Sequence, residues 1–352
     1  MRWNEFKGLL RNPLGAAGLF FIVSSFVVAI LAYQLAPDDT PNANQMNLAL
    51  ANKPPGFTVD ILHIPLKKVN SGFWDKLKGG QVSKTQQIAV SNYSISEEKL
   101  RYQVYTGSGT APRQHIELNT EYGNVYVEPK TFYLGTDKYG RDLLSRLFLG
   151  SRISFTVGFI SVLISLVIGI PLGLWAGYYG GWLDKLIMWL VNVVWSIPTL
   201  LLVIAITLAL GKGFWQVFIA VGCTMWVEVA RVVRGQVKSI REKEFIQAAK
   251  MLALSDFRVM FRHILPNVIA PVIVISSANF ASAILIESGL SFLGIGAQPP
   301  IPSWGGMIKD HYAYLVVGKA YLAIAPGMAI MLLVLSFMMV GNALRDVLDV
   351  KS

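Results

Sequence analysis

Six long apolar segments constrain the fold of this 352-residue chain more than any other feature. Each reaches or approaches the roughly 20 residues that a helix needs to cross a bilayer. Charged residues make up only 15% of the chain, against roughly 25% in soluble domains. We therefore expect an all-α polytopic membrane protein with six transmembrane helices. The predicted spans cover residues 14–35, 153–178, 184–210, 214–233, 268–290 and 320–344.

The positive charge of the chain, +10 in all, is concentrated beside these spans. Between Arg231 and Arg262 there are eight basic and three acidic residues, whereas ten basic and nine acidic residues nearly balance between Asp38 and Lys130. Cytoplasmic loops of membrane proteins carry such an excess of Lys and Arg, so this distribution argues against a nucleic-acid partner. Three cations precede the first span and place the N-terminus in the cytoplasm. Six spans then leave both termini on that side.

A long polar segment separates the first and second spans. Residues 37–130 contain no spanning run, and β-rich stretches such as Arg101-Tyr-Gln-Val-Tyr and Asn124-Val-Tyr-Val-Glu predict short strands. We expect a small extracytoplasmic insertion of α+β or β-rich structure. A disordered linker is the alternative, although aromatic residues are too frequent for a typical one. The expected organisation is 1–36 as cytoplasmic N-terminus and first helix, 37–130 as insertion, and 131–352 as helical core with a cytoplasmic loop over 236–266.

The sequence carries none of the common signatures of catalysis or metal binding. It has no Gly-x-x-x-x-Gly-Lys-Ser/Thr phosphate loop and no His-Glu-x-x-His motif. The four histidines are scattered, and the single cysteine, Cys223, is expected to pack in an apolar segment. We therefore expect no catalytic residue, no metal site and no cofactor. Glu228 and Glu287 are candidates for ion coupling, but each lies toward an end of its span, which favours an interfacial or structural role.

The second predicted span carries a row of glycines. Gly169, Gly173, Gly177 and Gly181 recur every four residues, so they are expected to share one helical face. Bare backbone on that face lets a neighbouring helix approach closely. We therefore assign the four glycines to helix packing.

The basic loop after the fourth predicted span has the composition of a docking element. From Glu244 onward, Ala248, Ala249 and Ala253 lie among good helix formers. Because these alanines are small, we expect the face that they form to seat deeply in a groove of a soluble partner. The alternative is an amphipathic loop that its Lys and Arg side chains hold to anionic lipid.

A second short helix is predicted after this one. Ser255 is placed to cap its N-terminus, with Asp256 at the positive end of the helix dipole. Pro266 is expected to mark where the helix stops or changes direction into the fifth span. Two short helices joined at Leu254 and Ser255 would form a rigid, force-bearing element.

This loop resembles the cytoplasmic loop of ABC-importer permeases. The pattern in that family is Glu-Ala-Ala, three residues, Gly, and a tail that ends in Leu-Pro. Gln247-Ala248-Ala249 and Leu265-Pro266 fill its two ends. Gln247 stands where Glu is usual, and Ala253 stands where Gly is usual. Alanine permits close approach but not a positive φ, so the resemblance leaves the geometry of this turn open.

Three further segments resemble the C-type permease of dipeptide, oligopeptide and nickel importers. The resemblance is strong from Leu134 to Asp349, weak over the first span, and does not explain the insertion. The three segments are Leu134-Gly-Thr-Asp-Lys-Tyr-Gly-Arg-Asp-Leu-Leu-Ser-Arg146, the stretch from Glu287 to Gly305, and Gly341-Asn-Ala-Leu-Arg-Asp-Val-Leu-Asp349.

The resemblance implies a permease subunit of an ATP-driven importer in a prokaryotic cytoplasmic membrane. Such a subunit forms half of a translocation pathway for peptides and works by alternating access. The implied partners are a homologous second permease, two ABC ATPase subunits, an extracytoplasmic solute-binding protein and membrane lipid. The residues implied for ATPase docking are Glu244, Gln247, Ala248, Ala249, Ala253, Ser255, Asp256 and Pro266.

Three alternatives to peptide import stay open at this point. A related importer could carry nickel or another small solute. An ion-coupled secondary transporter would need buried charges and internal repeats, which the sequence lacks. A scaffolding membrane protein would have no reason to carry this ordered set of motifs.

Overall fold

The computed structural model describes residues 3–66, 79–81, 83, 85–96, 99–107, 110–120, 123–211 and 213–349. Its contacts divide the chain into two compact units. Unit 1 comprises Met1–Ser25, Ser154–Gln298 and Met328–Ser352, and unit 2 comprises Phe26–Ile153 and Pro299–Gly327. These units do not follow the three-part division expected from the sequence, which stays a prediction.

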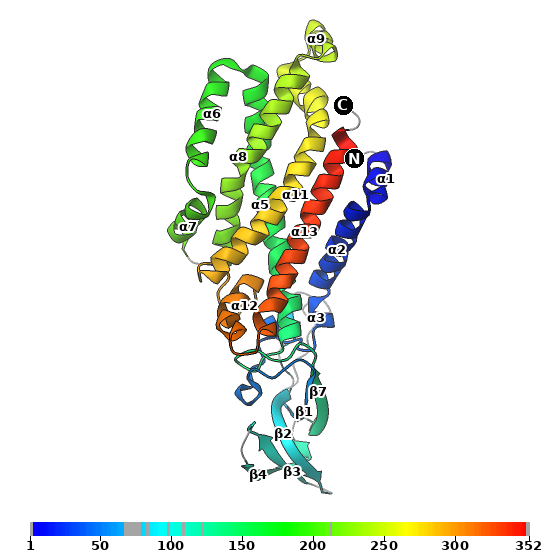
Figure 1. Ribbon diagram of the computed structural model, residues 1–352, viewed down its shortest axis with the longest axis vertical. Coiled ribbons are helices and arrows are strands. Elements are labelled where there is room, and N and C mark those ends of the chain that lie inside the picture. Colours follow the sequence, from blue (N-terminus) through cyan, green and yellow to red (C-terminus); the bar gives the residue numbers. More distant parts are fainter. Residues whose placement is uncertain are drawn as a thin grey trace. The chain divides into compact units, whose positions relative to one another are not determined.

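Long apolar helices make up most of unit 1 (Figure 1). In the described part of the chain, five helices are long and apolar enough to cross a membrane, and the bent pair α6 and α7 makes six if it counts as one span. The long helices are α2 (Pro13–Ile30), α5 (Leu143–Tyr179), α8 (Phe214–Arg241), α11 (Leu265–Phe292) and α13 (Tyr321–Asp349), with α1 (Trp3–Arg11), α6 (Gly181–Trp195) and α7 (Thr199–Leu210) shorter.

The third predicted span, over residues 184–210, is wrong as a single helix. α6 and α7 both form, but they meet at an angle of 89°. Pro198 occupies the N-cap position of α7. Proline disfavours helical backbone at the residue before it, here Ile197, so the helix breaks although the apolar run continues. The first predicted span is also interrupted, because a turn at Leu31 separates α2 from the short α3 (Ala32–Leu35).

Three of the four glycines let α5 and α8 pack closely. A Cβ atom added at Gly169 or Gly173 would lie 2.7 or 2.6 Å from a backbone carbonyl oxygen of α8. One added at Gly177 would lie 2.7 Å from Cβ of Val237. Real Cβ atoms do not approach so closely, so these three positions require glycine for the observed helix contact.

Gly181 does not continue this row, which corrects the expectation. It starts α6 with φ +55°, and no atom lies within 4 Å of the position where its Cβ would be. The chain turns at Gly180, which has φ +67°, so a spacing of four residues no longer keeps one helical face.

The N-terminal helices pack against the C-terminal half of α13. Leu9 of α1 lies in one apolar cluster with Val340, Ala343 and Leu344. Figure 1 accordingly shows both ends of the chain near the same end of α13. This arrangement places the first and last described segments of unit 1 side by side.

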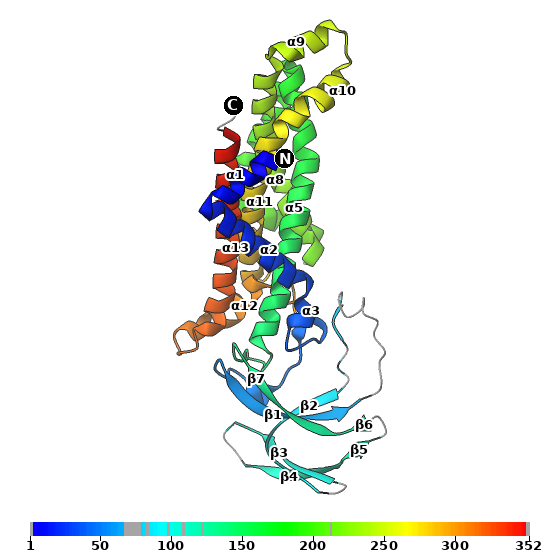
Figure 2. The same ribbon diagram turned by 90° about the vertical axis from the view of Figure 1, so that its right-hand side faces the viewer.

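Unit 2 contains an antiparallel five-stranded sheet with strand order β4-β3-β2-β1-β7 (Figure 2). Ile61 and Leu62 follow one another in β1 and therefore point to opposite faces, where each belongs to a different apolar cluster. The strands are β1 (Phe57–Pro65), β2 (Thr85–Ile95), β3 (Lys99–Tyr105), β4 (Thr110–Glu117) and β7 (Tyr126–Phe132), with a separate pair of β5 (Asn119–Thr120) and β6 (Gly123–Asn124).

The predicted insertion is therefore β-rich rather than a bare linker in its described residues. The strand predicted over 101–105 lies within β3, whereas the one predicted over 124–128 is interrupted at Val125 between β6 and β7. Other short helices in the described residues of unit 2 are η1 (Pro41–Ala43), η2 (Leu48–Leu50), α12 (Trp304–His311) and η4 (Tyr312–Leu315).

Candidate docking surface

The predicted docking loop folds as a compact helical element at one end of unit 1 (Figures 1 and 2). α9 (Glu244–Met251) follows α8 after a short turn. After a second turn, α10 (Asp256–Arg258) and a π-helix, η3 (Val259–Ile264), lead directly into α11. The pair of short helices expected from the sequence is thus present, but the second one is continuous with a membrane helix.

Ala253 has a φ of +56°, so the expectation that alanine would not adopt a positive φ here is wrong. The turn closes α9: the backbone N–H of Ala253 donates to the carbonyl of Lys250 at 2.9 Å, and that of Leu254 donates to Ala249 at 3.3 Å. Such a left-handed cap usually carries glycine, and alanine in this conformation costs about 1–2 kcal/mol. The turn therefore forms with alanine at position 253, and alanine in place of the usual glycine only lowers the stability of the turn.

Two further expectations about this element are corrected. Ser255 occupies the N-cap position of α10 with extended backbone, but its side chain makes no capping hydrogen bond. Pro266 does not end a helix. It lies in the first turn of α11, and the π-helical η3 runs directly into α11 without a stop.

Ala249 faces the interior of the protein rather than a partner. It is buried together with Ile246, and both belong to an apolar cluster with Val237 of α8 and with Val259 and Met260 of η3. The predicted small-residue face is therefore divided: Ala248 is exposed, whereas Ala249 fixes α9 to its own unit. Glu244, Gln247, Ala253, Ser255 and Asp256 also lie on the exposed side.

Several large apolar side chains are exposed on this element instead, and four of them are the most exposed. Met251 is 89% exposed, Leu252 75%, Phe257 68% and Phe245 44%. We call these four residues the docking patch. Large exposed apolar side chains that gather on one segment are typical of interaction surfaces. Sequence reasoning missed them because isolated Phe, Met and Leu residues look like core residues; the available signal was their presence in a segment otherwise rich in charge.

Tyr178, near the end of α5, contacts residues of α8, α9 and α10. Its hydroxyl donates to Oδ1 of Asp256 in α10 at 2.6 Å. Nη1 of Arg241, the last residue of α8, donates to the carbonyl of Tyr178 at 2.7 Å. Nζ of Lys250 in α9 lies 5.2 Å from the centre of the tyrosine ring. Tyr178 thus joins α5 to α8 through its backbone carbonyl and to α9 and α10 through its side chain.

A cluster of charges joins α6 to α8 in the same unit. Asp184 of α6 accepts hydrogen bonds from Nε and Nη2 of Arg234, the latter at 2.8 Å, and from Nζ of Lys238 at 2.7 Å. Two donors of one guanidinium hold the carboxylate in a fixed orientation. Arg234 and Lys238 therefore form ion pairs within the chain and are not free to bind a partner.

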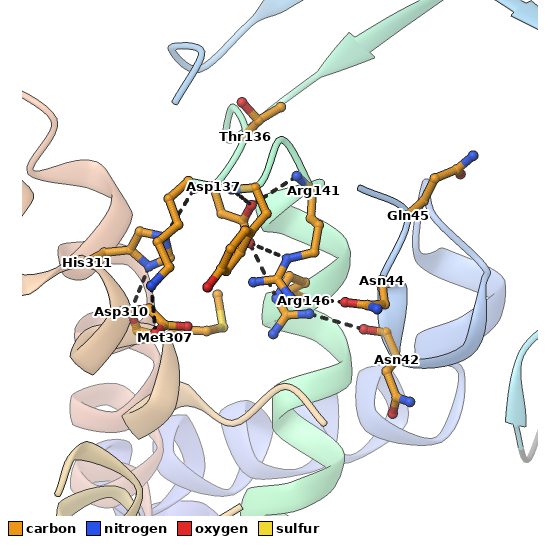
Figure 3. A network of polar contacts seen from close by, with 12 residues as sticks. Asn42, Asn44, Gln45, Thr136, Asp137, Arg141, Arg146, Met307, Asp310 and His311 are labelled. Carbon is orange, nitrogen blue, oxygen red and sulfur yellow. Dashed lines mark hydrogen bonds and ion pairs between the residues drawn. The ribbon is translucent and has the colours of Figure 1, made fainter. Parts of the chain in front are cut away.

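The segment from Leu134 to Arg146 forms a buried polar network in unit 2 (Figure 3). Asp137 accepts from Nε of Arg141 at 2.6 Å and from the backbone N–H groups of Tyr139 and Arg141 at 2.8 and 3.0 Å. Nε of Arg146 lies 3.8 Å from the same carboxylate. The side chains of Asp137, Arg141 and Arg146 are only 1%, 4% and 6% exposed.

The two arginines and the neighbouring lysine extend this network to other segments. Nη1 of Arg141 donates to Oδ1 of Asn44 at 3.0 Å, and Lys138 pairs with Asp310 of α12 at 3.0 Å. Figure 3 shows His311 beside Asp310; Nδ1 of His311 contacts the carbonyl of Met307 at 2.8 Å. Burial lowers the pKa of His311 below its ordinary value. The motif thus organises a structural junction within unit 2.

Known proteins similar to this chain include three from membrane transport. A chain in the inward-facing structure of the MetNI methionine ABC transporter aligns with a TM-score of 0.48 at 18% identity, over 57% of this chain and 95% of that one. The dipeptide transport system permease protein DppC of Alkalihalophilus pseudofirmus is 43% identical over 62% of this chain and 72% of its own length. The glutathione transport system permease protein GsiD of Pectobacterium atrosepticum is 41% identical over the same shares.

The match to the family is broad. Residues 169–351, more than half of the chain, match the family described as binding-protein-dependent transport system inner membrane component. This region includes α6 to α13 and therefore the whole docking element. The chain belongs to this family of transport-system permeases, and it is a multi-pass protein of the inner membrane.

Proposed function

We propose that this chain is the permease subunit of an ATP-driven importer of small peptides. Relatives 43% and 41% identical to it are described as dipeptide and glutathione permeases, and glutathione is itself a small peptide. Their shared solute class supports peptides over the alternative of nickel or another small solute. The chain forms half of the pathway beside a homologous second permease, and an extracytoplasmic binding protein delivers the solute.

The docking patch is the observation that carries the rest of this proposal. Met251, Leu252 and Phe257 are more exposed than a soluble surface favours. They lie at the end of α9, in the turn after it and in α10, and this element is continuous with the membrane helix α11 through η3. An apolar patch on a rigid element suits a partner that must push as well as bind. We assign it to an ABC ATPase, with hydrolysis occurring on that subunit and not on this chain.

This assignment orients the chain in the membrane. The end of unit 1 that carries α9 lies in the cytoplasm together with both termini, because the basic residues between Arg231 and Arg262 gather there. The sheet of the insertion then lies on the extracytoplasmic side, as expected from the sequence. We propose that it contacts the binding protein or the second permease.

The contacts of the docking element suggest how force reaches the pathway. Movement of α9 and α10 by the ATPases is passed to α5 through Tyr178 and to α8 through Arg241. Asp184 couples α8 to α6. η3 is continuous with α11, so the same movement tilts α11 directly. Alternating access then follows from rearrangement of the helices that line the pathway.

The experiment that tests the docking assignment replaces Met251 and Leu252 by Asp. Two desolvated carboxylates in an apolar interface cost several kcal/mol, so ATPase association should fall by at least about 100-fold. The matched control is Leu48→Asp, which changes a side chain that is 72% exposed outside the docking element. The measurement is co-purification of the ATPases with the permease and solute-stimulated ATP hydrolysis. Retained association in the Met251→Asp/Leu252→Asp variant would overturn the assignment.

Ala249→Arg is unsuitable as a test of docking. Because Ala249 is buried in the chain's own apolar cluster, an arginine there disrupts α9 itself. Loss of transport in that variant would not distinguish failed docking from local misfolding.

A further inference from the structure

A groove between α8, α11 and α13 opens beside the start of α9. Its volume is about 590 Å³, and its lining comes from these three helices and from the turn before α9. Val274 and Ile275 of α11 contribute apolar wall, and Gln236 and Asn267 contribute amide groups. None of these residues belongs to the docking patch. The groove is therefore a separate feature of the same end of unit 1.

The charged side chains of this groove are both cations. Lys243 precedes α9, and Arg345 lies near the end of α13. No carboxylate lines the groove, and neither cation forms an ion pair within the described residues. Lys238 of α8 differs from these two cations, because its ammonium group is paired with Asp184. Two unneutralised cations beside amide donors make a site for an anion.

The apolar wall specifies what kind of anion fits. Val274 and Ile275 lie within a helix that is long and apolar enough to span the membrane, so the groove passes from charged to apolar lining along the helix axis. A free inorganic anion would leave the apolar part empty. A phospholipid has both parts: a phosphate for the cations and an acyl chain for the wall.

We propose that this groove binds an anionic phospholipid of the cytoplasmic leaflet, with the phosphate between Lys243 and Arg345. Assignment to that leaflet rests on the orientation given by the proposed function; binding itself does not. Juxtamembrane cations attract the anionic lipids of this leaflet. Lys243 is also the N-cap residue of α9, so a bound lipid would hold the junction between α8 and the docking element.

The test uses the purified full-length chain in phosphatidylcholine nanodiscs to which phosphatidylglycerol is added. Bound phosphatidylglycerol is counted by native mass spectrometry. Each cation near an anionic headgroup contributes roughly fivefold in affinity, so Lys243→Gln/Arg345→Gln should weaken binding about 25-fold. The control, Arg101→Gln/Lys309→Gln, removes the same charge from exposed positions in unit 2 and should change binding less than twofold.

Five further outcomes decide the proposal. The charge-retaining pair Lys243→Arg/Arg345→Lys should keep binding the lipid. In 1 M NaCl, lipid binding by the wild type should weaken, and this test does not depend on the folding of any variant. Equal weakening in the control pair would overturn the proposal. Displacement of the bound phosphatidylglycerol by inorganic phosphate would also overturn it, because the groove would then be a simple anion site. Displacement of the lipid by an acidic dipeptide would place the groove in the translocation pathway instead.

Discussion

Removal of the Tyr178 hydroxyl should uncouple the docking element from α5 without unfolding either. Tyr178→Phe deletes one 2.6 Å hydrogen bond to the carboxylate of Asp256 but keeps the aromatic ring. The ring continues to pack in the apolar cluster that includes Ile246 and Val259. Its contact with Lys250 is also retained, since a cation is attracted to the face of Phe as well as of Tyr.

The size of this effect follows from the surroundings of the bond. A hydrogen bond to a charged group contributes about 1.5–3 kcal/mol. Asp256 is exposed, so water solvates its carboxylate once the hydroxyl is gone, and the lower limit of about 1.5 kcal/mol applies. This corresponds to roughly a tenfold increase in the population in which α10 is detached from α5.

The assay measures ATP hydrolysis and peptide uptake together in proteoliposomes that contain the assembled importer. We expect Tyr178→Phe to hydrolyse ATP at a near-normal rate but to transport fewer peptides per ATP. Asp256→Asn keeps an oxygen acceptor for the hydroxyl and should have a smaller effect. Tyr179→Phe is the matched control, since its ring is 49% exposed. An unchanged ratio of transport to hydrolysis in Tyr178→Phe would refute the reasoning.

Three other perturbations test separate parts of the structure. Ala253→Gly should stabilise the chain by about 0.5–1 kcal/mol, because relief of the left-handed alanine exceeds the added entropy of glycine in the unfolded chain; urea unfolding in detergent measures it, and a loss of stability would contradict the observed turn. Asp137→Asn should cost about 3–5 kcal/mol, because it leaves Arg141 and Arg146 buried without their carboxylate; a variant as stable as the wild type in the same assay would show that the network contributes little. Stability should also decrease as pH falls below about 6.5, because the unfolded chain then binds a proton that buried His311, with its lowered pKa, does not; His311→Gln should flatten this dependence, and an unchanged pH profile in that variant would assign it to other groups.

The membrane helices could be predicted from apolar length alone, but their shape could not. The run over residues 184–210 is predominantly apolar, and the bend of 89° at Pro198, between α6 and α7, is seen only in the structure. Likewise, the four-residue spacing of the glycines predicted one packing face. It held for Gly169, Gly173 and Gly177 but not for Gly181, because the helix ends before that residue.

The docking element shows a different limit of sequence reasoning. Its position in the chain and its division into two helices followed from composition and motif. The direction of each side chain did not, because Ala248 and Ala249 are adjacent and chemically identical, and only packing on α8 and η3 decides that Ala249 is buried. For the same reason Met251 and Leu252 could not be separated from core residues before the fold was known.

The turn at Ala253 shows that a favoured residue is not a required one. A positive φ was not expected of alanine, yet the hydrogen bonds that close α9 hold this conformation at an energetic cost. The geometry of the turn, which the resemblance left open, is therefore set by these hydrogen bonds rather than by the conformational preference of alanine.

The most direct test of the central claim is ATP-dependent uptake of a labelled dipeptide into proteoliposomes. These would contain this chain with its second permease, ATPases and binding protein, and wild type would be compared with Met251→Asp/Leu252→Asp. We predict uptake by the wild-type importer and its loss, together with ATPase binding, in the variant. Failure of the wild type to take up peptides while it takes up a nickel chelate would contradict the proposed solute. Full uptake by the variant would contradict the role of the docking patch.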